Sequence, residues 1–250
     1  MIDLLSLESY CNELLSIDDF DDYCPNGLQI EATEQVHKLM VGVTACQALI
    51  EEAEHWGADA LLVHHGYFWK GELESLRGIK GKRVGALFRQ RTGLLAYHLP
   101  LDAHAVYGNN RQFAEQLGFH QTAAPASGHP LIWQSTLPDP VTADDLGRLL
   151  GDCLAREPLH VAPNQQRLTR IGWCTGAAQG YLQEAYDLGL DAYISGEISE
   201  PTVHLSRELG IHYYAAGHHA TERYGVQALG QHLAERFTLE YRFVDIDNPV

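Results

Sequence analysis

The sequence lacks several features that would assign it at once to a particular class of protein. No apolar run reaches the roughly 18 residues that a membrane-spanning helix needs. The first eight residues, MIDLLSLE, carry no basic residue and do not resemble the start of a signal peptide. The five cysteines are scattered, and none forms a C-x-x-C pair. We therefore expect a reduced, cytoplasmic protein.

Positive charge is also scarce, because 17 Lys and Arg stand against 33 Asp and Glu, a formal net charge of −16. This balance argues against a basic nucleic-acid groove and against docking on anionic lipid. A local basic lining stays open as an exception; it would consist of Lys80, Lys82, Arg83, Arg89 and Arg91. An anionic substrate also stays open, since the charge of a bound metal can outweigh the field of the whole chain.

The remaining composition is that of an ordinary globular protein, with 45% hydrophobic and 20% charged residues. A chain of 250 residues is long enough for one large domain or two modest domains with a sizeable core. The fold class therefore has to come from patterns along the chain.

The most informative pattern is an apolar segment that ends in two adjacent histidines. Residues 60–63 read ALLV, and His64, His65 and Gly66 follow directly. Adjacent side chains on a continuing strand point to opposite faces, but at a strand end that turns at a glycine both can face one cleft. Because imidazole is a common metal ligand, the pair favours a metal site. A surface pair or a hydrogen-bonded core pair is the alternative.

Two segments of the chain, residues 39–66 and 170–197, have the same layout of strand, turn, helix and strand. At an offset of 132 residues, the dipeptide EA at 52–53 recurs at 184–185, and DA at 59–60 recurs at 191–192. At a shorter offset, G-L-x-x-Y from Gly93 matches G-I-x-x-Y from Gly210, which pairs Asp102 with His219. We predict an α/β fold of two related β-α-β lobes from an internal duplication, with mixed sheets covered by helices.

Helical spacing and turn residues predict the remaining elements. We expect helices at residues 3–16, 110–117, 142–154 and 226–237, a turn at 25–27 and a final strand at 239–244. Segment 121–166 is rich in proline, including Pro125 and Pro130, and is interpreted as an inserted, connecting segment. The predicted division is lobe 1 at 1–120, the connecting segment at 121–166 and lobe 2 at 167–250, within one compact structural unit.

Further ligand-type side chains follow the predicted strands. Asp102 lies in HLPLDAH after one strand, and His218 and Glu222 lie in GHHATE after another, where a helical turn would place both on one face. Five such ligands are too many for a catalytic zinc ion with three protein ligands, but they suit two divalent ions bridged by water in the cleft between lobes. The donor set does not distinguish zinc, iron, manganese, nickel and cobalt. The predicted metal ligands are His64, His65, Asp102, His218 and Glu222.

Other residues near these motifs carry weaker signals. His98 is the candidate catalytic residue, as a proton shuttle, although it can also be a ligand or orient Asp102. Glu197 matches a histidine of the first repeat and can hold a ligand or only end the sheet. We expect His104 and His219 at the surface.

Two loop segments leave their role open. The turn from Cys174 to Gly180 follows a strand and precedes a helix, so its N–H groups can bind a phosphate or only allow close packing. Cys174 has no evident basic partner that would make it a nucleophile. Tyr67, Phe68 and Trp69 follow the histidines and can stack on a planar ligand, but packing in a wall or a subunit contact is the preferred interpretation.

At these residues the sequence resembles the Nif-three-like family, whose bacterial members carry the label GTP cyclohydrolase I type-two homologue. The resemblance covers nearly the whole chain, and its motifs together are highly specific. The motifs are PNGLQ (25–29), VGVTA (41–45), GADALLVHHGYFWKG (57–71), HLPLDAH (98–104), WCTG (173–176), SGEISE (195–200) and AAGHHATER (215–223). The length matches the bacterial short form of the family.

The resemblance implies two related α/β lobes with a dinuclear metal centre between them, in a cytoplasmic, ring-shaped homohexamer. By motif it assigns the metal ligands to His64 and His65 in HHG, Asp102 in PLD, and His218 and Glu222 in GHHATE. Longer relatives insert an extra domain between the lobes. Here only segment 121–166 occupies that place, so no function of the larger insert is expected.

Three functions stay open at the level of sequence. The leading hypothesis is a metal-dependent hydrolase that acts on a small molecule or nucleotide, with a metal-activated water that suits a purine ring, a phosphoester or an amide. The second is a non-catalytic metal-binding ring or scaffold protein. The third is a ring that encircles nucleic acid, against which the net charge of −16 argues.

Overall fold

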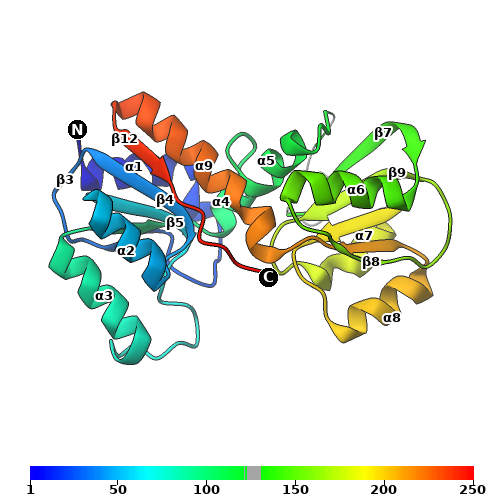
Figure 1. Cartoon of the computed structure of the whole chain (residues 1–250), viewed down its shortest axis with the longest axis horizontal. Coiled ribbons are helices and arrows are strands. Elements are labelled where there is room, and N and C mark those ends of the chain that lie inside the picture. The colour runs from blue at the N-terminus through cyan, green and yellow to red at the C-terminus, as the bar shows by residue number, and fades with distance from the viewer. Residues whose placement is uncertain (121, 123–130) are drawn as a thin grey trace. The chain divides into compact units, whose positions relative to one another are not determined.

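The computed structural model describes residues 1–120, 122 and 131–250, which form two compact units (Figure 1). Unit 1 comprises Met1–Gly108 and Gly225–Asp247, and unit 2 comprises Asn109–Tyr224 and Asn248–Val250. Each unit therefore contains two separate stretches of chain. The boundaries fall near residues 108 and 224 rather than at the predicted 120 and 166.

Unit 1 is built on a mixed five-stranded sheet. Its first four strands in the sheet order are parallel, and the last is antiparallel to its neighbour. The order is β12 (Glu240–Phe243), β4 (Lys38–Thr44), β5 (Ala60–His65), β6 (Gly93–Ala96) and β2 (Gly27–Ile30). A separate antiparallel pair joins β1 (Ile2–Asp3) to β3 (Gln35–Val36).

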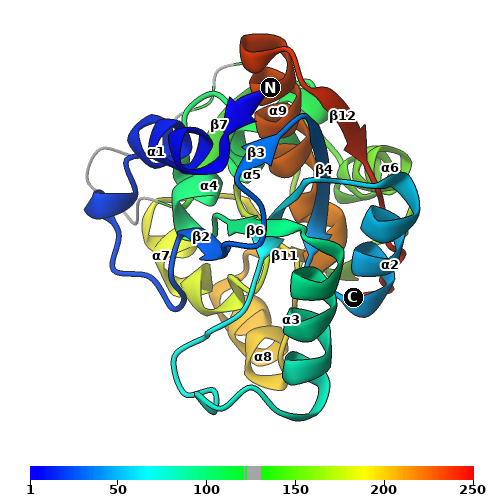
Figure 2. The same ribbon diagram turned by 90° about the vertical axis from the view of Figure 1, so that its left-hand side faces the viewer.

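Helices cover both faces of this sheet (Figure 1, Figure 2). Leu62 of β5 packs in a core with α1 and α9, whereas Leu61 and Val63 pack on the other face with α2 and α3. A parallel strand that is buried on both faces reads as a continuous apolar run, which explains residues 60–63. The helices are α1 (Leu4–Leu15), the 3-10 turn η1 (Ile17–Asp19), α2 (Gln47–Trp56), α3 (Gly78–Gln90), α4 (Leu99–Ala103) and most of α9 (His218–Phe237).

Unit 2 contains a second mixed five-stranded sheet, whose core includes Trp173, Ile194 and Tyr214. The order is β7 (Trp133–Val141), β9 (Leu168–Cys174), β10 (Ala192–Ser195), β11 (His212–Ala215) and β8 (Leu159–Val161). Its helices are α5 (Asn109–Gln116), α6 (Ala143–Leu154), the 3-10 turn η2 (Gln179–Tyr181), α7 (Leu182–Asp187), α8 (Glu200–Leu209) and the first turns of α9.

The two sheets share the strand layout that the predicted duplication requires. The three central parallel strands follow the same order, β4-β5-β6 and β9-β10-β11. Leu39 pairs with Ala60 in the first sheet, and Ile171 pairs with Ala192 in the second, which preserves the offset of 132. The third strands of the two sheets, β6 and β11, do not align as predicted. Ala60 pairs with Gly93 and the equivalent Ala192 pairs with His212, so Gly93 corresponds to His212. The predicted match of Gly93 with Gly210 was therefore two residues out of register. The predicted pairing of Asp102 with His219 is therefore wrong.

Segment 121–166 is not an inserted subdomain in the part that the structure describes. β7 and β8 are the two edge strands of the second sheet, so this segment completes unit 2. Pro138 and Pro140 lie on β7, where an edge position tolerates a residue without an N–H group. The predicted helix is present as α6, which Thr142 and Asp145 begin with a reciprocal capping box. Pro125 and Pro130 lie outside the described residues.

The other predicted elements are confirmed with small shifts. The helices predicted at 3–16 and 110–117 are α1 and α5, and the last strand is β12. The helix predicted at 226–237 begins earlier, at His218, and continues without a break. The cysteines are free, as expected. Among the described residues, no helix combines the length and apolar character needed to cross a membrane.

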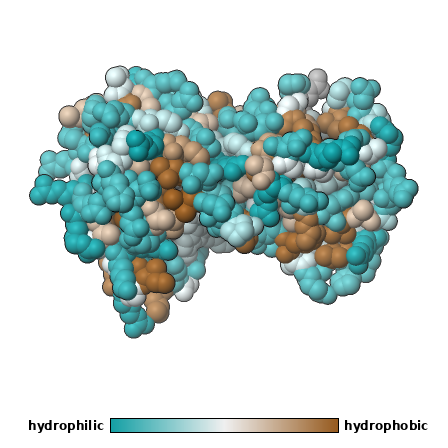
Figure 3. Space-filling view, viewed as in Figure 1, coloured by the Kyte–Doolittle hydropathy of each residue, from teal (hydrophilic) through white to brown (hydrophobic). Residues whose placement is uncertain are grey.

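The start of α3 and the loop before it combine exposed apolar side chains with basic ones. Leu73, Leu76 and Ile79 are exposed by 63%, 53% and 69%, and Figure 3 shows apolar surface at the lower end of this helix. Lys82 and Arg89 are carried by the same helix. Apolar patches rimmed by charge are typical of protein contact sites. The hexameric ring that the resemblance implies stays a prediction.

The edge of the second sheet suggests a first test, because two histidines meet there. His160 Nε2 lies 3.0 Å from His212 Nδ1, and the His160 ring stacks on Tyr214 with centroids 4.2 Å apart. Burial lowers the pKa of both histidines, and His212 lowers that of His160 further, against the opposing charges of Asp144 and Asp191.

A histidine with a lowered pKa binds protons more tightly in the unfolded chain, so stability is greatest above the unfolded pKa of about 6.5 and falls below it. We predict that the free energy of unfolding falls by up to ~1.4 kcal/mol per pH unit per histidine as the pH drops from 7.5 to 5.5. His160→Gln should reduce this loss, and the exposed His204→Gln should not. Urea unfolding at both pH values measures it, and equal pH slopes in all three proteins would contradict the prediction.

Candidate metal-binding residues

Four functional side chains predicted from the sequence meet in unit 1. His64 and His65 are the last residues of β5, and His98 and Asp102 follow the adjacent parallel strand β6, one before and one within α4. The carboxyl ends of parallel strands meet at one edge of a sheet, which brings these residues together. The ring centroids of His98 lie 5.1 Å from His64 and 5.8 Å from His65, and one ring nitrogen from each of the three histidines lies within 4.8 Å of the others.

A backbone hydrogen bond orients His64. Its Nδ1 lies 2.8 Å from the carbonyl oxygen of Tyr97, and because a carbonyl only accepts, Nδ1 carries the proton. The Nε2 lone pair then faces Asp102, whose Oδ1 lies 3.4 Å away. Both side chains are buried. Two acceptors that face each other in a buried place require a proton or a cation between them.

A carboxylate holds His98 in a similar way. His98 Nδ1 donates to Asp22 Oδ1 at 2.7 Å, and the His98 backbone N–H donates to Asn26 Oδ1 at 2.7 Å. Burial raises the pKa of Asp22, but the hydrogen bonds from His98 and Asn26 outweigh it and leave the pKa at about 2. Trp69 packs edge-on against the His98 ring, with centroids 4.9 Å apart. His98 does not orient the Asp102 side chain through its ring; its carbonyl accepts from the Asp102 backbone N–H.

Cys24 forms a further group of possible ligands with Asp22 and His98. One possible ligand atom from each of the three lies within 4.8 Å of the others. Burial and the nearby Asp22 charge raise the pKa of Cys24 to about 12, so Cys24 is a thiol in the metal-free chain. The Asp22 carboxylate is already occupied by hydrogen bonds from four donors.

Unit 2 brings together a second group at the start of α9. His218 Nε2 lies 3.1 Å from Glu222 Oε2, as the four-residue spacing predicts, and His218 Nδ1 donates to Glu197 Oε1 at 2.7 Å. Burial lowers the pKa of His218, but Glu222 and Glu197 outweigh it and raise the pKa to about 9. Glu197 therefore orients His218, a contact that the sequence did not predict.

Two glycines make room for this group. A Cβ on Gly176, which has a φ of +71°, would lie 2.0 Å from Glu222 Oε1. A Cβ on Gly196 would lie 2.6 Å from the Cα of His218. Gly196 is the position that matches His64 in the duplication, so the second lobe has a glycine where the first has a ligand-type side chain.

The turn from Cys174 to Gly180 supports packing rather than a phosphate site. The N–H of Thr175 donates to Asn110 Oδ1, that of Gly176 donates to Thr221 Oγ1, and that of Ala178 donates to Ser195 Oγ. Backbone donors that already serve protein acceptors are not available to an anion. The turn thus holds Gly176 beside the start of α9.

The remaining candidates are structural. His104 Nδ1 accepts from the backbone N–H groups of Val106 and Tyr107, and His104 is half-buried. His219 is buried, so the expected surface position is wrong. Tyr67 is also buried and donates to the Ala45 carbonyl oxygen, which confirms its interpretation as wall packing.

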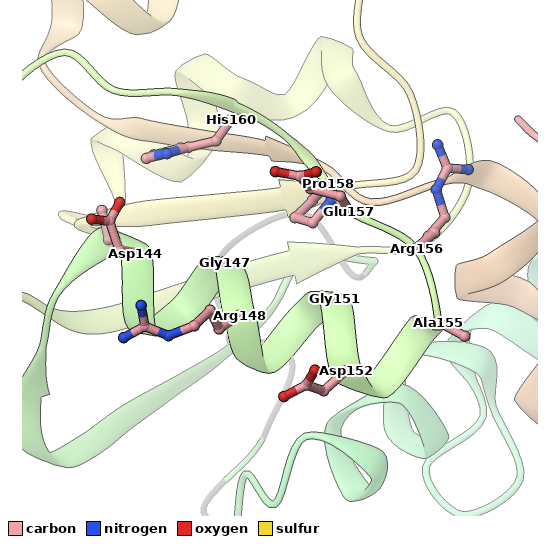
Figure 4. A pocket seen from close by; sticks show the side chains of 11 residues that line it. Asp144, Gly147, Arg148, Gly151, Asp152, Ala155, Arg156, Glu157, Pro158 and His160 are labelled. Carbon is pink, nitrogen blue, oxygen red and sulfur yellow. The ribbon is translucent and has the colours of Figure 1, made fainter.

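A cavity of about 570 Å³ lies elsewhere in unit 2, beside α6 and β8 (Figure 4). Gly147 and Gly151 lie on its α6 side, and Arg148, Glu157 and His160 are among its lining residues. Its charged side chains have mixed signs, and none of the described metal-capable groups of His, Cys, Asp and Glu lies there. The candidate chemistry therefore stays with the strand ends.

Two residues that hold His98 were not predicted from the sequence, Asp22 and Asn26. Both lie in the stretch DDFDDYCPNG, where only a turn at 25–27 was predicted. Asp22 is buried whereas Asp21 beside it is exposed, and no local pattern separates the two. The available signal in the sequence was that Asp22 and Asn26 are four residues apart in a loop that contains Pro25. In the structure the two side chains form a hydrogen bond.

Comparisons with known proteins find relatives that span nearly the whole chain. The sequence profile of the family described as Duf34/NIF3 (NGG1p interacting factor 3) matches residues 2–249. A relative from Vibrio cholerae, named GTP cyclohydrolase 1 type 2 homolog, is 50% identical over 256 residues, which covers 98% of this chain and 99% of the relative. A relative of the same name from Escherichia coli K12 is 46% identical and covers 97% of this chain and 98% of its own length.

Solved structures share the whole fold. A protein described as ybgI, of unknown function, is 44% identical with a TM-score of 0.95, and the match covers 100% of both chains. TTHA1606 from Thermus thermophilus is 31% identical with a TM-score of 0.90, again over 100% of both chains.

Gly176 and Gly180 lie in one turn and provide a test of the unit 2 group. Gly176→Ala would strain a backbone φ of +71° and force Glu222 to move, whereas a Cβ on Gly180 meets no atom within 4 Å. We predict that Gly176→Ala weakens binding of Zn²⁺ or Mn²⁺ by ~10- to 100-fold, as expected when support of a ligand is lost. Gly180→Ala should bind as the unaltered chain does. Competition with a chromophoric chelator measures the affinity, and circular dichroism checks folding. Equal affinities in the two folded variants would show that Glu222 is not a ligand.

Proposed function

Because the chain belongs to the Duf34/NIF3 family, we propose that it is a metal-dependent hydrolase with a dinuclear site. The proposal combines ligands from unit 1 and unit 2, in the cleft that the duplication led us to predict between the lobes. The proposed ligands are His64, His65, Asp102, His218 and Glu222.

The observation that carries the proposal is a shared hydrogen-bond pattern. The Nδ1 atoms of His64, His98 and His218 donate to a backbone carbonyl, to Asp22 and to Glu197. Each bond directs the Nε2 atom away from that partner, and metal-binding histidines characteristically have such a partner on the other nitrogen. His64 and His218 are proposed ligands with this arrangement, and His98 has the same arrangement as the proposed proton acceptor beside them.

Burial of the carboxylates supports the same conclusion. Asp102 is 5% exposed and Glu222 is 2% exposed. A buried carboxylate is costly unless a cation or several donors compensate it. Imidazole nitrogens beside carboxylate oxygens suit zinc, iron, manganese, nickel and cobalt, so the donor chemistry fits divalent ions without selecting one.

The proposed reaction is hydrolysis. Two divalent ions at such a site would lower the pKa of a water molecule and polarise the bond that it attacks. In this proposal the carboxylates of Asp102 and Glu222 would bind the metal cations. Nε2 of His98 would accept the proton that the attacking water releases. The name of the relatives makes GTP the first substrate to test, with phosphoesters and cyclic amides as the other classes that such chemistry serves.

Metal content is the first measurement. We predict about two equivalents of divalent metal per chain after equilibration with Zn²⁺, Mn²⁺ or Fe²⁺ and removal of excess. His64→Ala and Glu222→Gln should each hold one equivalent or less, because each removes a ligand. His204→Ala is the control, since His204 is exposed and pairs with Glu200 of its own helix. Elemental analysis decides the question, and a chain that binds no metal under any of these conditions would refute the proposal.

Turnover is the second measurement. The metal-loaded chain should hydrolyse at least one member of a set containing GTP, phosphomonoesters, phosphodiesters and cyclic amides. His98→Gln should keep its metal and lose ~10²- to 10⁴-fold in rate, the usual contribution of a proton-transfer group. Metal binding without turnover across the set would favour the non-catalytic metal-binding alternative instead.

A further inference from the structure

The carboxylate of Asp22 accepts hydrogen bonds from four donors, two from its own loop and two from the start of α4. Oδ1 accepts from the backbone N–H of Tyr23 at 2.6 Å and from His98 Nδ1 at 2.7 Å. Oδ2 accepts from Asn26 Nδ2 at 2.8 Å and from the backbone N–H of Leu99 at 2.9 Å. A carboxylate with four donors stays ionised, in agreement with its pKa of about 2.

An ionised carboxylate determines the tautomer of the imidazole that it contacts. Asp22 can only accept, so Nδ1 of His98 must carry the proton in this contact. The neutral ring then has its lone pair on Nε2. Since a ring nitrogen of His98 lies within 4.8 Å of ring nitrogens of His64 and His65, and Nδ1 is held by Asp22, Nε2 is the nitrogen directed at the proposed metal ligands.

We propose that Asp22 is a positioning residue that fixes His98 in the Nδ1-protonated tautomer and presents its Nε2 lone pair to the His64-His65 pair. This inference rests on the proposed function for its purpose, because a proton acceptor beside the metal ligands needs a free lone pair. Trp69 supports the same orientation by packing edge-on against the His98 ring.

Asp22 and Asn26 separate this role from a purely structural one. Both connect the loop before β2 to His98 or Leu99, and both therefore stabilise the loop. Only Asp22 contacts the imidazole ring, whereas Asn26 contacts the His98 backbone N–H. Asp21 offers a second contrast, since its side chain is 96% exposed and pairs with Lys70. Loss of loop stability and loss of the tautomer can thus be told apart.

The test is the tautomeric state of His98, read from the ring ¹⁵N signals of chelator-treated, ¹⁵N-histidine-labelled full-length chain in mildly alkaline buffer. His98 signals are assigned by comparison with His98→Gln. In the unaltered chain we expect a protonated Nδ1 and an unprotonated Nε2. Asn26→Ala and Asp21→Ala should keep this state, and Asp22→Ala should lose the single tautomer. Urea unfolding of each variant reports loop stability separately.

The unaltered chain alone can overturn the inference, so the outcome does not depend on whether Asp22→Ala folds. A His98 ring protonated at Nε2, or a mixture of tautomers, would refute it. An unchanged tautomer in folded Asp22→Ala would also refute it, and loss of the tautomer in Asn26→Ala to the same degree would assign Asp22 a structural role. The measurement uses no metal, so failure of the metal proposal leaves its result unaffected, and the reverse also holds.

Discussion

The arrangement of the candidate site depends on one kind of interaction, the hydrogen bond from an imidazole Nδ1 to an acceptor that cannot donate. His64 uses the Tyr97 carbonyl oxygen, His98 uses Asp22 and His218 uses Glu197. Each bond fixes both the protonated nitrogen and the plane of the ring, so Nε2 points in a defined direction. Without these partners, the same histidines would be mobile rings with interconverting tautomers.

The sheet supplies these partners because of its topology. β5 and β6 are parallel neighbours, so the Tyr97 carbonyl that follows β6 lies beside His64, the last residue but one of β5. The second sheet has the same strand layout, but its imidazole comes from a different element. β10 ends at Ser195 and is followed by Gly196 and Glu197, and the imidazole is that of His218 at the start of α9. The glycines of the second lobe make room for His218 and Glu222 in place of a histidine pair.

Much of the fold and part of the site could be predicted from the sequence. Local patterns predicted the register of the parallel strands, the place of His64 and His65 at the end of β5 and the contact between His218 and Glu222, and the structure shows all three. The prediction failed where partners come from distant sequence. The segment that contains β7 and β8 was interpreted as an insertion. Both are edge strands of the second sheet, and an edge strand can be recognised only from the strand with which it pairs. The third strand was placed two residues out of register for the same reason.

The sequence by itself determined which residues can carry metal chemistry, since residue type and spacing along a strand or helix are local properties. It did not reveal Asp22, which lies in the aspartate-rich stretch DDFDD beside exposed neighbours. Only the tertiary structure decided that this one carboxylate is buried against His98, 76 residues further along the chain. The physical reason is that burial and hydrogen-bond partnership between distant segments depend on how the chain folds back on itself, which no local pattern records.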